Sequence, residues 1–213
     1  CFSSINAQEA KEEKKAEEGF VFTTIKENPI TSIKNQNRSS TCWSFSSVAF
    51  LESELLRQGK GEFDLSEMFI VHHTMEDRAV NYVRYHGDAS FSPGGSFEDM
   101  VVCYEKYGMV PQDAMPGIMY GDSLPVHNEL DAVAGAYVEA IGKGKFSKLT
   151  PVWKNGLRSI YDTYLGECPK EFNYNGKTYT PRTFADEVLK LNMNDYISLT
   201  SYTHHPFYTQ FNV

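Results

Sequence analysis

Apolar residues recur at helical spacing in several stretches of the chain, most of them in its first two thirds. In the first stretch, Val48, Leu51 and Leu55 lie three or four residues apart, which places them on one helix face. Ser66 and Ser96 are residue types that cap helices, and each precedes a further apolar stripe. The pattern predicts helices over residues 42–57, 66–85, 96–107, 126–141, 153–165 and 181–191.

Strand signals are short and fewer. Asn175-Gly176 lies between aromatic and threonine positions of the segment 172–179, and Asn-Gly is the strongest short-range signal for a β-hairpin. Residues 19–25 and 196–200 alternate in part and are typical of a short strand or an extended segment. Helices therefore dominate, and paired strands are expected mainly near the end of the sequence.

The composition is that of a globular protein with an acidic balance. Of 213 residues, 41% are hydrophobic and 23% are charged, and 28 Asp and Glu against 20 Lys and Arg give a net charge of −8. This balance argues against a broad nucleic-acid-binding surface and against electrostatic docking on anionic lipid. No apolar run reaches the roughly 18 residues that predict a membrane span.

Residues 1–18 differ from the rest of the chain. Small, mildly apolar residues end at Ala7, and the Lys/Glu/Ala run from Lys11 to Glu18 has no apolar stripe to bury. We interpret the segment as a signal-peptide remnant cut near Ala7, followed by a solvated leader. A signal peptide of this kind predicts a bacterial protein that is exported to the periplasm or the cell surface. The alternatives are a lipid-bearing Cys1, as in a bacterial lipoprotein, and a natural cytoplasmic terminus.

The four cysteines do not form a metal-binding pattern. They are Cys1, Cys42, Cys103 and Cys168, and none belongs to a C-x-x-C pair. We therefore expect no structural zinc site, no other metal and no cofactor. Cys103 and Cys168 are typical of small buried hydrophobic residues.

Cys42 stands out because a polar, loop-like stretch leads to it and a helix begins with it. Unpaired N–H groups and the helix dipole stabilise a thiolate there, and the thiolate is the nucleophilic form. The Cys42 N–H and the Gln36 side-chain amide could together bind an oxyanion, and Trp43 offers an apolar shoulder. The same residues also fit a buried cysteine at a helix start beside a core tryptophan.

The run Gln36-x5-Cys42-Trp43-x-Phe45 resembles the nucleophile region of papain-like cysteine peptidases. It is most similar to the bleomycin hydrolase/aminopeptidase C branch, where Asn-Gln precedes the nucleophile by the same spacing and Cys-Trp-x-Phe contains it. Ser39 stands where many secreted relatives have a cysteine, so their disulfide is not expected here.

Three later segments resemble the same branch in order and spacing. Residues 65–69 are similar to the start of its second helix, residues 93–100 to its Gly-Gly loop and next helix, and residues 105–111 to the close of that helix. The resemblance implies an α+β, papain-like fold of two lobes. It divides the chain into the leader 1–18, a helical nucleophile-bearing lobe 19–111, a helical insertion with a hairpin 112–195, and the start of a β-rich lobe 196–213.

The resemblance also implies a function and a set of site residues. The protein would be a cysteine peptidase, aminopeptidase-like, that cleaves peptides through an acyl-enzyme. Cys42 would be the nucleophile, Gln36 an oxyanion donor, and Gly94, Gly95 and Trp43 would bind the peptide substrate. Taken alone, Gly94-Gly95 reads as an ordinary turn before a helix.

The expected catalytic histidine has no obvious candidate among these residues. The simple papain spacing places it near residues 172–192, where there is none. His204 and His205 lack the following residues that the family shows. We therefore expect the histidine and its asparagine partner to lie on a second fragment or on further sequence. A homo-oligomer is compatible with the sequence.

Two other functions compete with the peptidase. One is a papain-like binding protein without a working catalytic pair. The other is a secreted, aromatic-rich ligand-binding module that exposes Trp153, Tyr161 and Tyr164.

Overall fold

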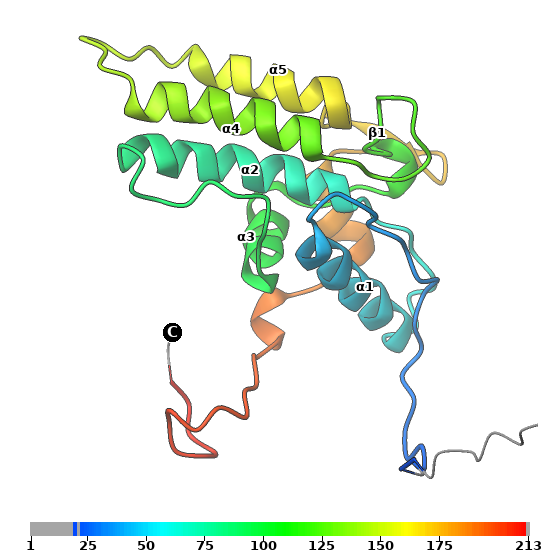
Figure 1. Cartoon of the computed structure of the whole chain (residues 1–213). Coiled ribbons are helices and arrows are strands. Elements are labelled where there is room, and N and C mark those ends of the chain that lie inside the picture. Colours follow the sequence, from blue (N-terminus) through cyan, green and yellow to red (C-terminus); the bar gives the residue numbers. More distant parts are fainter. Residues whose placement is uncertain (1–18, 21, 212–213) are drawn as a thin grey trace, which may run out of the picture.

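The structure is a computed structural model that describes residues 19–20 and 22–211 (Figure 1). The segment expected to be a signal remnant and leader lies outside the described residues. The elements in chain order are α1 (Cys42–Arg57), α2 (Glu67–Arg84), α3 (Phe97–Tyr107), η1 (Gln112–Ala114), α4 (Asn128–Lys143), α5 (Trp153–Leu165), β1 (Phe172–Tyr174), β2 (Lys177–Tyr179), α6 (Pro181–Phe184), η2 (Ala185–Leu189) and η3 (Met193–Asp195).

Helix α2 is the central element of the fold. It contacts α1 and α3 on one side and α4 and α5 on the other. Figure 1 shows α2, α4 and α5 stacked as one layer, with α1 and α3 beneath it. Helices α1 and α3, which carry the papain-like segments, and helices α4 and α5 of the expected insertion therefore all pack against α2.

Helix ends follow the capping chemistry of the sequence. The Ser66 hydroxyl accepts a hydrogen bond from the Phe69 N–H at 3.2 Å, and the Asp99 carboxylate accepts one from the Ser96 N–H at 2.8 Å. Gly108 ends α3 with a φ of 90°, and a Cβ there would lie 2.2 Å from a backbone oxygen of the α6 segment. A glycine is thus required at this close approach.

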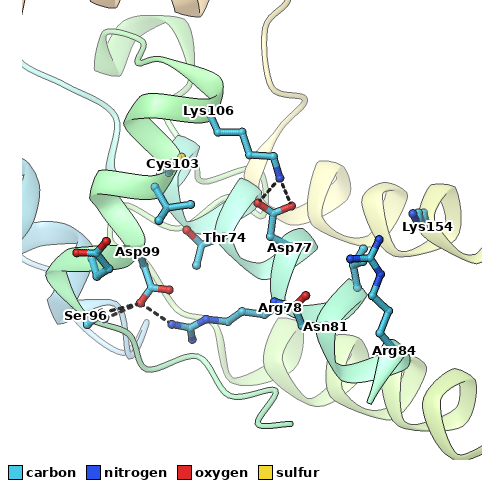
Figure 2. Close-up of a pocket in the computed structure, with 13 residues that line it drawn as sticks. Thr74, Asp77, Arg78, Asn81, Arg84, Ser96, Asp99, Cys103, Lys106 and Lys154 are labelled. Carbon is cyan, nitrogen blue, oxygen red and sulfur yellow. Dashed lines mark hydrogen bonds and ion pairs between the residues drawn. The ribbon is translucent and has the colours of Figure 1, made fainter. Parts of the chain in front are cut away.

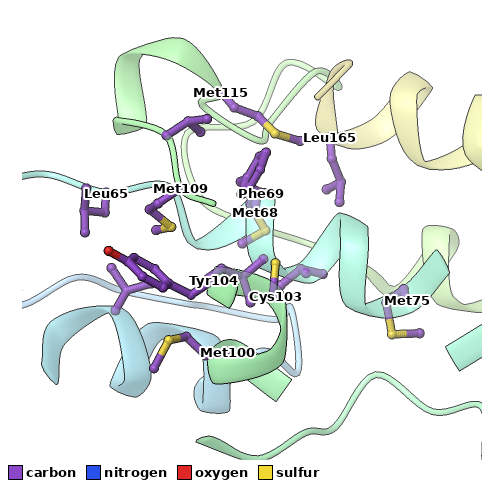
Figure 3. Packing of buried hydrophobic residues seen from close by; sticks show 14 of the residues in the cluster. Leu65, Met68, Phe69, Met75, Met100, Cys103, Tyr104, Met109, Met115 and Leu165 are labelled. Carbon is purple, nitrogen blue, oxygen red and sulfur yellow. The ribbon is translucent and has the colours of Figure 1, made fainter. Parts of the chain in front are cut away.

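The core beneath α2 is rich in methionine. Met68, Met100, Met109 and Met115 are all buried, and Figure 3 shows them near Tyr104 of α3 and Phe69 of α2. Unbranched thioethers fill irregular gaps between helices that cross at different angles. The core is therefore continuous from α1 to the connection that leads into α4.

The predicted hairpin is confirmed. Strands β1 and β2 pair antiparallel around Asn175-Gly176, whose φ values of 50° and 79° suit the tight turn. Phe172 packs edge-on against Phe184 of α6, with ring centroids 5.3 Å apart. The predicted helix over 181–191 forms only in part, because α6 passes into a π-helical turn that ends at Lys190.

The strand expected over residues 196–200 is absent, and the described residues of 19–25, expected as a strand or an extended segment, are not a strand. Ile197 and Leu199 are 82% and 87% exposed. A strand needs a neighbour to pair with its backbone, and β1–β2 is the one sheet among the described residues. That sheet and the many helices confirm an α+β, helix-rich fold. Among the described residues, no helix combines the length and the apolarity that crossing a membrane requires.

Candidate active site

Cys42 is the first residue of α1, and its side chain is exposed. The preceding residue, Thr41, caps the helix through its carbonyl oxygen, which accepts the Ser44 and Phe45 N–H groups at 2.9 and 3.2 Å. The thiol consequently stands in the first turn, where free N–H groups and the helix dipole favour a negative charge. The predicted placement of Cys42 is confirmed.

The loop before Cys42 is clamped by the segment that enters α4. The Arg38 N–H donates to the Pro125 oxygen at 3.1 Å, and the His127 N–H donates to the Arg38 oxygen at 3.0 Å. The Asn37 side chain adds a third bond to Pro125 at 3.2 Å. This clamp holds Asn37 and Ser40 in left-handed conformations, with φ values of 48° and 57°. No sequence signal links residues so far apart.

An ion cluster anchors the other end of this loop. The Lys34 ammonium lies 3.0 Å from Glu52 of α1, 3.2 Å from Glu67 of α2 and 2.6 Å from Asp64. Burial lowers the pKa of Lys34, but the hydrogen bond with Asp64 and the charge of Glu67 outweigh it and raise the pKa overall. Burial raises the pKa of Glu67 despite the nearby lysine. Lys34, which precedes Gln36 by two residues, therefore stabilises the buried carboxyl groups of Glu52 and Glu67.

Gln36 lies between these two anchors and is half-buried. Its side-chain oxygen is enclosed and has no hydrogen-bond partner among the residues the structure describes. The backbone that carries it is held by the Lys34 cluster and by the clamp at Arg38. The role of Gln36 as an oxyanion donor stays a prediction.

Trp43 is only 4% exposed and supports the Gly-Gly loop from below. Its indole N–H donates to the Pro93 oxygen at 2.9 Å. A Cβ on Gly95 would lie 2.5 Å from the Trp43 ring, whereas one on Gly94 would meet nothing within 4 Å. Gly94 and Gly95 are themselves exposed. The structure thus brings Trp43 and both glycines together beside the helix turn that begins with Cys42.

Arg78 of α2 ties the same loop from the other side. Its guanidinium donates to the oxygens of Ser92, at 2.9 Å, and of Gly94, and pairs with the Asp99 carboxylate at 2.7 Å (Figure 2). It also lies 5.7 Å from the centre of the Trp43 ring. Sequence reasoning missed Arg78, because an arginine on a polar helix face carries no signal for contacts with a distant loop.

A charged cavity of about 580 Å³ lies between α2 and α3, and Arg78 forms part of its wall. Figure 2 shows Asp77 paired with Lys106 on its wall, where the ammonium lies 2.8 Å from the carboxylate. Neither Cys42 nor Gln36 lines this cavity. The cavity is therefore separate from the surface that surrounds Cys42.

The histidines have varied surroundings. His72 and His127 are buried, and burial lowers the pKa of His127 to about 4, although a hydrogen bond that the imidazole donates to the Ser39 backbone carbonyl opposes this shift. His205 stacks on Phe211, with ring centroids 4.0 Å apart. All six histidines belong to the described part of the chain, and there none of them forms a hydrogen bond with Cys42. The source of a catalytic base stays a prediction.

Comparison with known proteins gives the class of this site. Residues 20–81 match the model of the papain family of cysteine proteases. This match covers α1 and most of α2, including Gln36, Cys42 and Trp43, and it confirms the resemblance to papain-like cysteine peptidases.

Several curated proteins that the chain resembles are named aminopeptidases. Aminopeptidase G of Lactobacillus delbrueckii subsp. lactis is 24% identical over 222 residues, which cover 88% of this chain and 50% of the relative. Aminopeptidase C of Listeria monocytogenes is 25% identical over 200 residues, which cover 78% and 45%. Aminopeptidase E of Lactobacillus helveticus is 24% identical, with 88% and 50% covered. The chain spans about half the length of these curated relatives.

Proposed function

We propose that the protein is a cysteine peptidase in which Cys42 attacks the peptide carbonyl. The observation that carries this proposal is the exposed thiol in the first turn of α1, beside a glycine loop held by Trp43 and Arg78. The match to the papain family over residues 20–81 supports it.

In the proposed reaction the Cys42 thiolate bonds to the carbonyl carbon, and the carbonyl oxygen takes the negative charge. The Cys42 N–H and the Gln36 amide bind this oxyanion. The C–N bond then breaks, a proton reaches the leaving amine from the catalytic base, and water hydrolyses the acyl-enzyme. The exposed backbone of Gly95 pairs with the substrate in the manner of a strand.

The catalytic base in this proposal is a histidine held by an asparagine, both outside the 213 residues. The positions of the present histidines support this, because three are partly or fully buried beneath helices and His204 and His205 pack against Phe211. A second fragment or further sequence would supply the pair.

The finer assignment is an aminopeptidase, on the strength of the names of the relatives. It predicts that peptides with a free amino terminus are cleaved much faster than the same peptides after N-acetylation. Equal rates for both would leave a cysteine peptidase but remove the aminopeptidase assignment.

Export from the cytoplasm is a further part of the proposal, and residues 1–18 carry it. The small residues before Ala7 support cleavage there. Amino-terminal sequencing of the protein from its native host tests it: a terminus at Gln8 supports export, and an uncut terminus opposes it.

Of the competing functions, the aromatic binding module loses its support. Trp153 is 8% exposed and Tyr161 is 1% exposed, because both lie on the face of α5 that packs into the core. The binding module would need these rings exposed, whereas their spacing with Leu157 is that of a core stripe, and the core is where they lie. A papain-like protein that binds peptides without cleaving them is the second candidate.

The deciding experiment compares the intact protein with Cys42→Ala on fluorogenic peptide amides. The substitution removes the nucleophile and little volume, so hydrolysis should vanish while the fold is kept. Gln36→Ala should lower kcat by about 10²–10³, the usual effect of one lost oxyanion donor. Full activity in Cys42→Ala would end the peptidase proposal, and no activity in either protein would favour the non-catalytic candidate.

A further inference from the structure

A second group of reactive side chains lies where α2 meets the end of α5. The ligand atoms of His72, His73 and Cys168 all lie within 4.8 Å of one another. The two histidines belong to α2, and Cys168 follows Gly166, the residue that ends α5. We propose that these three residues, with Glu76, bind one Zn²⁺ ion. The site is separate from Cys42 and does not depend on its chemistry.

His72 directs one ring nitrogen at a carboxylate and leaves the other free for a metal ion. Its side chain is 1% exposed, and its Nε2 lies 2.8 Å from an oxygen of Asp162. An ionised carboxylate can only accept a hydrogen bond, so Nε2 carries a hydrogen, and in the neutral form of the ring the lone pair is then on Nδ1. That Nδ1 is buried without a hydrogen-bond partner in the described part of the chain. A metal-binding histidine typically donates its other N–H to a carboxylate in this way.

The neighbouring residue, His73, also has a ring nitrogen without a hydrogen-bond partner among the described residues, its buried Nδ1. The ring is fixed between Tyr107, stacked at 4.0 Å, and Phe69, edge-on at 4.6 Å. A buried nitrogen without a partner is costly, and two of them on adjacent residues are explained by a common ligand.

Cys168 and Glu76 complete the set. Cys168 is half-buried, and Glu76 places a carboxylate oxygen 3.8 Å from Nδ1 of His72. Arg158 holds that carboxylate through two hydrogen bonds of 2.7 and 2.8 Å, which orient it while leaving lone pairs free. Two imidazoles, a thiol and a carboxylate form a mixed N/S/O set of the kind that Zn²⁺ binds.

Tetrahedral zinc with bonds of about 2.0–2.3 Å requires ligand atoms about 3.3–3.7 Å apart. The ligand atoms of His72, His73 and Cys168, which are up to 4.8 Å apart, therefore have to approach one another by about 1 Å. The Glu76 carboxylate lies outside this group of three and has to move in by side-chain rotation. Binding converts the thiol into a thiolate, and its proton passes to solvent. A cavity of about 180 Å³ borders Glu76, Tyr107 and Arg158 on one side of the cluster.

Zinc at this position would join two parts of the fold. His72, His73 and Glu76 lie on the central helix α2, and Cys168 lies on the connection between α5 and β1. The ion would therefore fasten the expected insertion to the helices that carry the nucleophile. Sequence spacing gave no signal for it, because the cysteine follows the histidines by more than ninety residues.

The test is calorimetric titration of the intact protein with Zn²⁺. The protein carries Cys42→Ser, which removes the exposed thiol, and a phosphine reductant keeps Cys168 reduced. One ion should bind per chain. Asp162→Ala should weaken binding by about 10–100-fold, the effect expected from losing a residue that orients a ligand. Cys168→Ser should weaken it further, and His86→Ala, which changes a histidine outside the cluster, should leave it unchanged.

Binding of Co²⁺ provides a second, spectroscopic measurement, because a change in folding alone does not produce its absorption band. Co²⁺ bound by Cys168 should give a thiolate-to-metal charge-transfer band in the near ultraviolet, absent from Cys168→Ser whose circular dichroism matches the parent. Stoichiometric binding with the band retained in Cys168→Ser would overturn the assignment. The absence of stoichiometric Zn²⁺ binding to the parent protein would overturn the site.

Discussion

Two adjacent residues at the start of α1 have opposite surroundings. The Cys42 thiol is exposed, whereas Trp43 is 4% exposed and donates to the loop that contains Gly94 and Gly95. Consecutive residues on a helix point about 100° apart, so Cys42 can face solvent while its neighbour Trp43 faces the core. The chain thereby presents a nucleophile and supports a candidate substrate loop with neighbouring residues.

Gly95→Ala should destabilise the protein, because the new methyl group would overlap the Trp43 ring. A Cβ there lies 2.5 Å from the ring, and overpacking of this kind costs about 1–3 kcal/mol. The urea midpoint of unfolding measures the loss. Gly94→Ala is the matched control, since its Cβ meets nothing within 4 Å, and its stability should stay close to that of the parent. Equal midpoints for both variants would show that the loop does not rest on Trp43.

How far single residues can be predicted depends on the range of their contacts. The position of Cys42 in the first turn followed from the local pattern of loop and apolar stripe. Arg78 and Pro125 could not be found in this way, because each meets the site through backbone groups of a distant loop. Every residue has a backbone carbonyl oxygen, so the residue type does not indicate which of these oxygens will accept a hydrogen bond from a distant side chain or loop.

At the scale of elements, local signals set most of the boundaries. The predicted helices over 42–57 and 153–165 have the observed bounds, since an apolar stripe runs through each and a glycine follows closely. The strand expected over 196–200 failed, because alternation alone does not supply a pairing partner. The helix over 181–191 changes to a π-helical turn, which its apolar spacing did not indicate.

The start of α4 should make stability depend on pH. His127 is buried there, and burial lowers its pKa to about 4 from an ordinary value of 6.5. The unfolded chain therefore binds a proton that the folded chain refuses between pH 6.5 and 4, so stability is lost as the pH falls through this window. The contribution is up to about 1.4 kcal/mol per pH unit.

His127→Gln removes this titration and keeps a polar side chain of similar size. Chemical unfolding at several pH values should show a shallower loss of stability in the variant than in the parent between pH 6.5 and 4. The difference between the two proteins isolates His127 from other groups, including Asp131, whose pKa is raised to about 6 by burial and which acts in the opposite direction. Parallel curves would contradict the assignment.

At the scale of the whole molecule, the loop that carries Gln36 is fixed at both ends by other parts of the chain. Lys34 links it to α1 and α2, and Arg38 links it to the segment before α4. The helices of the expected insertion therefore help to position the candidate active site. The order of the papain-like motifs predicted the lobe, but it did not predict this support from the insertion.

Lys34→Met should destabilise the whole molecule. It leaves the carboxyl groups of Glu52 and Glu67, whose side chains are 1% and 4% exposed, without their cation. Breaking such a buried pair costs 3–5 kcal/mol, and the cost here should be about 3 kcal/mol because Lys34 is 24% exposed. Lys143→Met is the control, since its pair with Glu139 is on the surface and contributes little. Thermal unfolding compares them, and similar losses in both would refute the cluster's role.

The central claim is that Cys42 is the nucleophile of a peptidase. The most direct measurement is labelling of the intact protein with a peptide-like electrophile, followed by peptide mapping by mass spectrometry. The account predicts one label per chain, located on Cys42 and blocked by competing peptide, with Cys103 and Cys168 unlabelled because burial raises the pKa of both thiols. A label on Cys168 in place of Cys42, or labelling of Cys42 that competing peptide does not slow, would contradict it.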